Sequence, residues 1–179
     1  MKIYAALLRG VNLGGHKKLP MADFRTMVSE LGLKNPKTYI QSGNLVFGSD
    51  LKPAELEKLI ETAIEERFGF FSRTQVVPAS EIRRALDEYP YDREVHTSCH
   101  VTFLDAEPSD EAKAEIASND YAPDNISFGR KMLFLYLPNG VANAKVDFGK
   151  LERALKVNST SRNLRTVGKI ADLCESIEQ

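Results

Sequence analysis

The sequence predicts an α+β protein built from two similar halves in tandem. Two observations lead to this prediction. Short apolar runs alternate with segments whose apolar residues recur at helical spacing, and the same order of strands and helices occurs twice along the 179 residues. At roughly 100–200 residues per domain, this length allows one domain or two small ones.

The first half shows the clearest pattern. Residues 2–8 form an apolar run typical of a buried strand, and Pro20 precedes a helix with apolar residues at helical spacing. Residues 38–41 and 45–47 form a predicted hairpin, residues 53–68 an amphipathic helix, residues 75–78 a strand and residues 80–89 a helix that Pro90 ends. This β-α-β-β-α-β order is the split βαβ, or ferredoxin-like, arrangement.

The second half repeats most of this order. We predict a strand at residues 99–104, a helix at 109–117, a hairpin of residues 125–128 and 132–137, and helices at 146–155 and 161–175. The boundary is placed in residues 90–97. We therefore expect two ferredoxin-like subdomains with mostly antiparallel sheets, residues 1–90 and residues 91–179, the second a variant with an extra C-terminal helix.

Composition excludes several classes of protein. The chain is 42% apolar and 27% charged, with 11 Gly and 8 Pro, which argues against disordered, collagen-like and low-complexity chains. No apolar run approaches the ~20 residues of a membrane span, and no signal-peptide pattern is visible. Cys99 and Cys174 imply no disulfide framework, so we expect a cytoplasmic protein that does not bind membranes.

Charge is unevenly distributed, although the formal net charge is only −1. The net charge is +4 over residues 1–50, −9 over residues 51–129, +7 over residues 130–170 and −3 over the remaining tail. This pattern favours a basic region assembled from both ends of the chain, whereas the alternative is a set of solvated faces with chance clustering.

Three segments are candidates for a ligand site. The first, which we call the basic loop (residues 9–18, RGVNLGGHKK), lies between a predicted strand and helix, where glycine backbone N–H groups and cations can bind phosphate. It has neither the Walker A nor the dinucleotide-binding pattern. It is also about ten residues long where the second half uses only residues 105–108. An ordinary glycine-rich turn remains the alternative.

The other two segments are polar. The second, the polar turn (residues 41–44, QSGN), offers hydrogen-bonding groups, although a simple hairpin turn also explains it. The third, residues 160–169 (TSRNLRTVGK), is predicted to begin the last helix, with Thr160 or Ser161 as its cap. Cations in a first helical turn oppose the helix dipole, so Arg162 and Arg165 there favour a bound anion. An exposed basic face is the alternative.

These three segments together resemble a known family. Residues 4–15 (YAALLRGVNLGG), 39–44 (YIQSGN) and 160–169 occur in the order found in the bacterial family called domain of unknown function 1697. The resemblance covers nearly the whole chain. It implies a cytoplasmic protein with two ferredoxin-like subdomains, and it implies no established activity or cofactor.

The sequence thus predicts a basic site, formed where the three segments meet, for an anionic small molecule or nucleotide. The predicted ligand-binding residues are Arg9, Asn12, Gly14, Gly15 and Lys17 of the basic loop, Gln41, Ser42 and Asn44 of the polar turn, and Arg162, Asn163, Arg165 and Lys169. A nucleic-acid-binding module and a scaffold whose polar motifs only lock the two halves together remain alternatives.

An enzyme of group transfer or hydrolysis is a further alternative, but no catalytic residue is identified. His16 is the one candidate general base within the basic loop. Residues 96–100 contain metal-binding residue types without an indicated fourth ligand, so we expect no metal site and no cofactor. The oligomeric state stays open.

Overall fold

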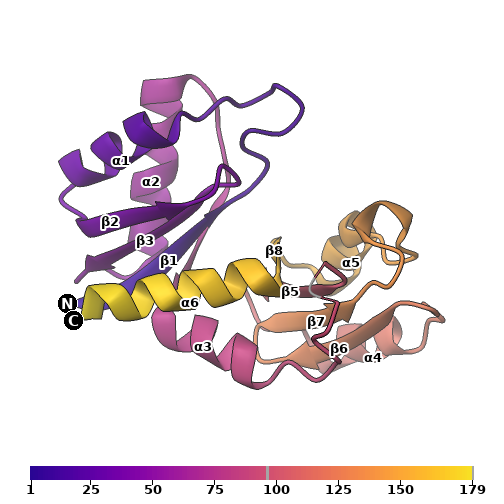
Figure 1. Ribbon diagram of the computed structural model, residues 1–179. Helices are drawn as coiled ribbons and strands as arrows, with labels where there is room; N and C mark the ends of the chain where they lie inside the picture. The colour runs from indigo at the N-terminus through magenta and orange to yellow at the C-terminus, as the bar shows by residue number, and fades with distance from the viewer. Residues whose placement is uncertain (96, 179) are drawn as a thin grey trace. The chain divides into compact units, whose positions relative to one another are not determined.

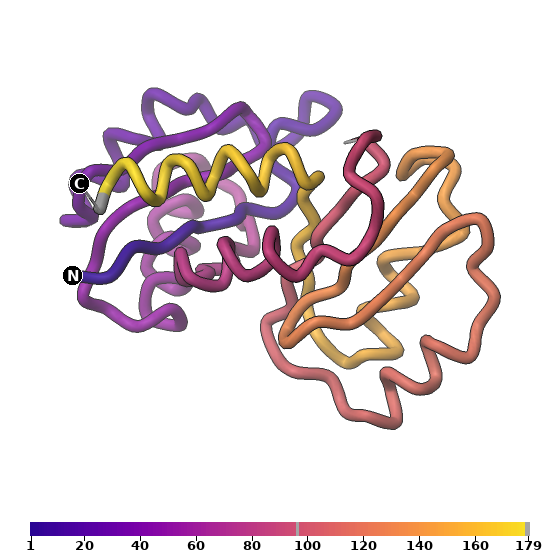
Figure 2. The backbone as a smooth tube through the Cα atoms, turned by 60° about the horizontal axis from the view of Figure 1, so that its bottom comes forward, coloured from indigo at the N-terminus to yellow at the C-terminus, as the bar shows by residue number. Residues whose placement is uncertain are grey.

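The computed structural model describes residues 1–95 and 97–178, and the chain divides into two units. The first unit comprises Met1–Arg83 and Lys169–Gln179, and the second comprises Arg84–Gly168. The backbone leaves the first unit through α3 (Ala79–Asp87) and returns to it through α6 (Leu164–Glu178), as Figure 2 lets the reader trace. The predicted boundary at residue 90 falls inside the second unit.

The first unit contains a four-stranded antiparallel sheet in the order β2-β3-β1-β4. Its elements follow the chain as β1 (Lys2–Leu8), α1 (Met21–Glu30), β2 (Lys34–Tyr39), β3 (Asn44–Ser49), α2 (Pro53–Phe68) and β4 (Thr74–Pro78). Figure 1 shows α1 and α2 on one face of this sheet and the second half of α6 on the other. This is the predicted ferredoxin-like arrangement.

Helical and strand periodicity explain the core of the first unit. Alternate residues of β1 point to the helices, and α1 and α2 each turn one apolar stripe toward them. The buried cluster includes Tyr4, Ala6, Leu8, Phe24, Met27, Leu45, Phe47, Leu56, Ile60 and Ile64. This core holds the sheet and both helices together. It also supports the basic loop, which follows β1, and the polar turn, which lies between β2 and β3.

The second unit repeats the topology with the order β6-β7-β5-β8, again antiparallel throughout. Its elements are β5 (Cys99–Leu104), α4 (Asp110–Ala117), β6 (Asn125–Gly129), β7 (Met132–Tyr136), the 3-10 turn η1 (Val141–Asn143), α5 (Phe148–Leu155) and β8 (Ser159–Asn163). A cluster around Leu104, Ile116, Leu133, Leu135, Leu151 and Leu155 packs α4 and α5 on the sheet. Both halves are therefore ferredoxin-like.

One predicted element was wrong. Residues 161–163, expected to begin the last helix, belong to strand β8, and α6 starts at Leu164. The sequence of β8 is polar (STSRN) and has no apolar alternation to mark a strand. It is a strand because it pairs with β5, with Ser161 opposite Thr102 and a hydrogen bond of 3.1 Å between their hydroxyl oxygens.

Glutamates of the packed helices cover one edge of each sheet. On α2, Glu61 and Glu57 accept the backbone N–H groups of Thr74 (2.8 Å) and Val76 (2.9 Å) of edge strand β4. On α5, Glu152 accepts both the N–H and the hydroxyl of Ser159 of edge strand β8, each at 2.8 Å. These contacts occupy backbone donors that an exposed edge strand would otherwise offer to another chain.

The second half of α6 belongs to the first unit. Lys37 Nζ of β2 donates to Ser176 Oγ at 2.8 Å, and Arg83 forms an ion pair with Glu175. The C-terminal residues thus complete the first unit, although they follow the whole second unit in sequence. None of the helices in the described ranges is long and apolar enough to span a membrane.

Candidate functional site

The basic loop leaves the sheet where β1 ends and returns to it before α1. Its ends are anchored by the buried side chains of Val11 and Leu19, whereas residues 13–18 between them are exposed. Gly14 and Gly15 have φ of +55° and +79°, values that glycine adopts without a Cβ clash. The loop projects from the end of the sheet, as Figure 1 shows in indigo.

Asn12 gives the basic loop a fixed shape. Its backbone N–H donates to Lys17 O at 3.1 Å, so the loop folds back on itself. Its amide Nδ2 donates to Leu19 O (3.0 Å), and its Oδ1 accepts the N–H of Leu19 (2.8 Å). The same Nδ2 donates to Gln41 O at 2.8 Å. Asn12 therefore joins the basic loop to the polar turn, and two of the three predicted segments meet.

Hydrogen bonds from Asn44 and from the backbone of Leu8 fix the shape of the polar turn. Asn44 Nδ2 donates to Tyr39 O at 3.1 Å and to Ser42 Oγ at 2.9 Å, and the N–H of Leu8 donates to Gly43 O at 2.8 Å. A Cβ on Gly43 would lie 2.7 Å from Leu8 Cβ and 2.7 Å from Val11 Cγ2. Gly43 therefore allows the turn to contact the base of the basic loop.

Arg73 joins the basic loop through the register of the sheet. Leu8 of β1 lies opposite Thr74 of β4, and the next residue pair is Arg9 and Arg73, whose backbones are joined by an N–H to O bond of 2.9 Å. Ser72 Oγ also donates to Arg9 O at 3.0 Å. Two exposed arginines thus occupy facing positions, where like charges normally destabilise a sheet.

The structure places four cations at this end of the first unit: Arg9, Lys17, Lys18 and Arg73. In the part of the chain that is described, no carboxylate lies within 4.0 Å of the charged groups of Lys17, Lys18 or Arg73. The N–H groups of Gly14 and Gly15 likewise have no protein acceptor there. We call these four cations with the basic loop's backbone the cationic end.

Sequence reasoning missed Arg73 and Ser72. A signal was present, because a β-α-β-β-α-β unit places its last strand antiparallel to its first, so the residue before the last strand faces the residue after the first. To identify Arg73 from this signal, one would need the register of the first strand against the last, and the short run TQVVP does not define it.

The third segment has a different structure from the one predicted. Asn163, rather than Thr160 or Ser161, caps α6, because its Oδ1 accepts the N–H of Thr166 at 2.8 Å. Arg162 lies on β8 and donates to Ser161 O at 2.9 Å. It is half-buried over the whole residue, and burial of its guanidinium lowers its pKa to about 10.

The remaining cations of the third segment lie on α6. Arg165 is exposed in the first turn of the helix, and Lys169 forms an exposed ion pair with Asp172 at 3.2 Å. Only Arg165 therefore fits the predicted position of a cation opposing the helix dipole. The third segment runs from the second unit into the first, and its convergence with the other two segments stays a prediction.

A cavity of about 510 Å³ is present elsewhere, between α4 and α5 of the second unit. Its lining includes Tyr121, Lys145, Asp147 and Lys150. None of the predicted site residues lines it, so the cationic end is a surface distinct from this cavity. Within the described ranges no group of three or more His, Cys, Asp or Glu side chains is placed to hold a metal ion, and His96 lies outside those ranges.

The fold has a counterpart among solved structures. A conserved bacterial protein, SP0830 from Streptococcus pneumoniae, is similar with a TM-score of 0.73 and 24% sequence identity, over 97% of this chain and 98% of that one. No curated protein matches the chain. The family model described as a protein of unknown function (DUF1697) matches residues 1–134, and the chain belongs to this family.

Proposed function

We propose that the first unit binds a phosphate-bearing small molecule or nucleotide at the cationic end. The observation that carries the proposal is that Lys17, Lys18 and Arg73, at the same end of the first unit as Arg9, have no carboxylate partner among the described residues. A phosphate would neutralise part of this positive charge and accept charge-assisted hydrogen bonds from Arg73 and from the two lysines.

In this proposal the asparagines position the site and the cations contact the ligand. The amides of Asn12 and Asn44 already bind backbone groups of the first unit, which fixes the two loops before a ligand arrives. A fixed loop loses less conformational entropy on binding than a mobile one. The exposed N–H groups of Gly14 and Gly15 would supply further donors to a phosphate oxygen.

A small ligand is favoured over a nucleic acid strand. The cationic end is local, and the C-terminal half of the adjacent helix α2 carries exposed carboxylates that include Glu65 and Glu66. A strand that tracked beyond the loop would approach these carboxylates. Cytoplasmic location, where phosphorylated metabolites are available, is part of the same proposal.

Titration calorimetry with inorganic pyrophosphate, ADP and a single-stranded RNA tests the proposal. We expect pyrophosphate or ADP to bind, and Arg73→Ala to weaken binding by about tenfold to a hundredfold, since a hydrogen bond to a charged group contributes roughly 1.5–3 kcal/mol. Arg73→Lys should retain part of the affinity because it keeps the charge but not the bidentate geometry.

Lys58→Ala is the matched control, because Lys58 is an exposed cation of the same unit on α2. Equal losses in the Lys58 and Arg73 variants would refute a localised site. RNA binding far tighter than ADP binding, with a steep dependence on salt, would favour the nucleic-acid alternative instead.

A further inference from the structure

The four sheet edges of the molecule are not equally protected. On edge strand β4 two backbone N–H groups bond glutamates of α2, and on edge strand β8 the N–H of Ser159 bonds Glu152 of α5. Edge strand β2 contains Pro36 and a register shift between Lys34 and Lys37, features that discourage pairing with another chain. Strand β6 occupies the same edge position in the second unit, and it has no proline, no charged residue and an unbroken register with β7.

The outward backbone groups of β6 can be identified from its hairpin. The β6–β7 turn consists of Arg130 and Lys131, and the pair that closes it is Gly129 with Met132. The pair that closes a two-residue loop is hydrogen-bonded, and hydrogen-bonded and non-hydrogen-bonded pairs then alternate along the two strands. The N–H and C=O groups of Ile126 and Phe128 therefore point away from β7, and in the described part of the chain they bond to nothing.

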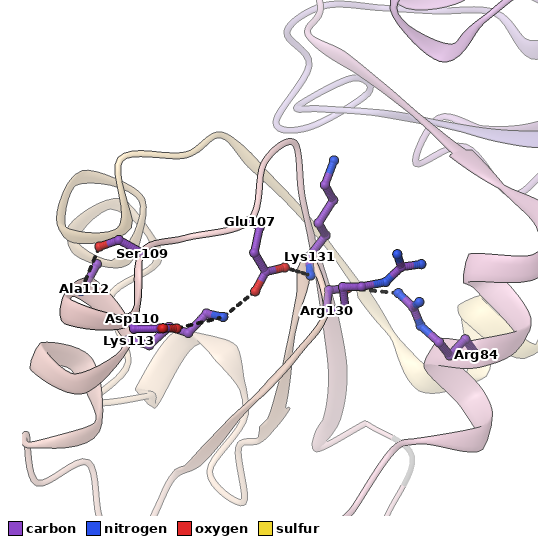
Figure 3. Close-up of polar contacts among 8 residues, drawn as sticks. All are labelled: Arg84, Glu107, Ser109, Asp110, Ala112, Lys113, Arg130 and Lys131. Carbon is purple, nitrogen blue, oxygen red and sulfur yellow. Dashed lines mark hydrogen bonds and ion pairs between the residues drawn. The ribbon is translucent and has the colours of Figure 1, made fainter.

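The hairpin that carries this edge is held in place. Glu107 accepts the N–H of Lys131 at 2.6 Å and pairs with Lys113 of α4, while Arg84 donates to Arg130 O at 3.0 Å (Figure 3). These contacts leave the side chains of Arg130 and Lys131 extending from the turn. The edge is thus ordered before any partner binds.

The edge is complementary to itself when reversed. The exposed Asp120 precedes β6, and Arg130 and Lys131 follow it, so an antiparallel copy brings opposite charges to each end of the paired strands. Asp124 is buried instead, and one of its carboxylate oxygens accepts the N–H groups of Lys145 at 2.6 Å and Val146 at 3.1 Å. The buried Ser127 hydroxyl has no hydrogen-bond partner of acceptable geometry among the described atoms, although the Tyr91 hydroxyl lies near it.

We propose that β6 pairs antiparallel with β6 of a second copy of this chain, about a two-fold axis through Ser127. In this register Ile126 lies opposite Phe128 of the second copy, and each such pair exchanges both of its backbone hydrogen bonds. Ser127 faces its own counterpart, and Arg130 of the second copy lies opposite Asp124. A two-fold axis through Ile126 or through Phe128 would pair that residue with its own copy, and the other of the two would not take part in this pair. The axis through Ser127 therefore uses the outward backbone groups most fully.

Oxidative cross-linking of full-length variants tests this register. Facing residues of a non-hydrogen-bonded pair have Cα atoms roughly 4.5 Å apart, within the range of a disulfide. We expect Ser127→Cys to give a covalent dimer under mild oxidation. Asn125→Cys is the matched control on the same strand, because two copies of residue 125 would lie roughly 14 Å apart at 3.4 Å per residue.

Equal cross-linking of both variants, or none in either, would overturn the proposal. Native Cys99 and Cys174 are buried and present in both variants, so any cross-linking through them contributes equally to the two measurements.

Sedimentation analysis of the chain without added cysteines provides an independent test. Ile126→Pro removes only an outward N–H, a position where an edge strand tolerates proline, and should raise the dimer dissociation constant by about tenfold. Ile126→Ala removes the same apolar side chain but keeps the N–H, and should dimerise nearly as well as the parent chain. The proposal is refuted if the chain is monomeric at every concentration tested. It is also refuted if only an unrelated extended peptide, and not a second copy, pairs with β6.

Discussion

The two halves share one topology but connect their first strand to their first helix differently. In the second unit the connection between β5 and α4 is short and acidic, and Glu107 within it binds the β6–β7 turn. In the first unit the connection between β1 and α1 is longer, rich in glycine and basic, and Asn12 within it binds the polar turn. In both units this connection therefore anchors the neighbouring hairpin.

The difference between them is what remains exposed after that anchoring. Because the second unit closes the same fold with the shorter connection, the topology does not require the extra residues of the basic loop. Those residues carry Lys17 and Lys18, which have no carboxylate partner in the described chain. Comparison of the halves thus separates the structural part of the loop from the part available to a ligand.

The largest expected effect concerns the contact between the polar turn and β1. Gly43→Ala should lower the free energy of unfolding by about 3 kcal/mol, because φ is +77° and the new Cβ would clash with Leu8 and Val11. Gly69→Ala at the end of α2 is the control, with φ of +74°, a left-handed helical conformation and open space around the new Cβ, and should cost about 1 kcal/mol. Urea unfolding followed by circular dichroism measures both, and similar costs would contradict the close approach.

The next effect tests whether Asn12 organises the basic loop. Asn12→Ala should cost about 2 kcal/mol, because the N–H of Leu19 and the carbonyls of Leu19 and Gln41 lose a partner. Hydrogen exchange of the Leu19 amide should accelerate at the same time. Asn139→Ala, an exposed asparagine in a turn of the second unit, is the control and should leave stability within about 0.5 kcal/mol of the parent. Unchanged exchange at Leu19 would show that the loop does not depend on Asn12.

A smaller effect compares the covered edges of the two sheets. Glu152→Ala should cost about 1–2 kcal/mol, because two donors of Ser159 lose their acceptor, whereas Glu61→Ala removes the acceptor of one donor and should cost about 1 kcal/mol. Glu152→Gln keeps an acceptor oxygen and should recover most of the loss. An equal cost for the Ala and Gln variants would mean that the glutamate acts through its charge.

The smallest effect is a dependence of stability on pH that arises from His100 of the second unit. Burial lowers the pKa of His100 from its usual 6.5, so the unfolded chain binds this proton more readily than the folded one. Stability should therefore be complete above about pH 6.5 and decline as the pH falls below it. His100→Gln should remove this decline, and His16→Gln, which changes an exposed side chain of the basic loop, should not. Urea midpoints measured between pH 5 and pH 8 decide the matter.

The fold was largely predictable because most elements carry strong periodic signals. Helix α2 has a clear amphipathic period, strands β1 and β5 are short apolar runs bounded by polar residues, and the repeated element order then indicates the topology. Strand β8 was not predicted, because it is stabilised by pairing with β5 and by a hydrogen bond to Glu152. The five polar residues of β8 carry no sequence signal for either contact.

The candidate site was predictable only in part, for a related physical reason. The basic loop and the polar turn are conspicuous as sequence, and their meeting through Asn12 is a contact within one unit. Arg73 becomes part of the cationic end only through the antiparallel register of β1 and β4. Local residue chemistry thus identifies segments, while the register of a sheet determines which side chains face one another.

The return of the C-terminal helix to the first unit has a consequence for synthesis on the ribosome. The segment that carries Ser176 and Glu175 emerges after the whole second unit, so the first unit has to wait for it while the second is already able to fold. A nascent chain released early would lack the helix that covers one face of its first sheet, and we expect such a product to be a substrate for chaperones or proteases.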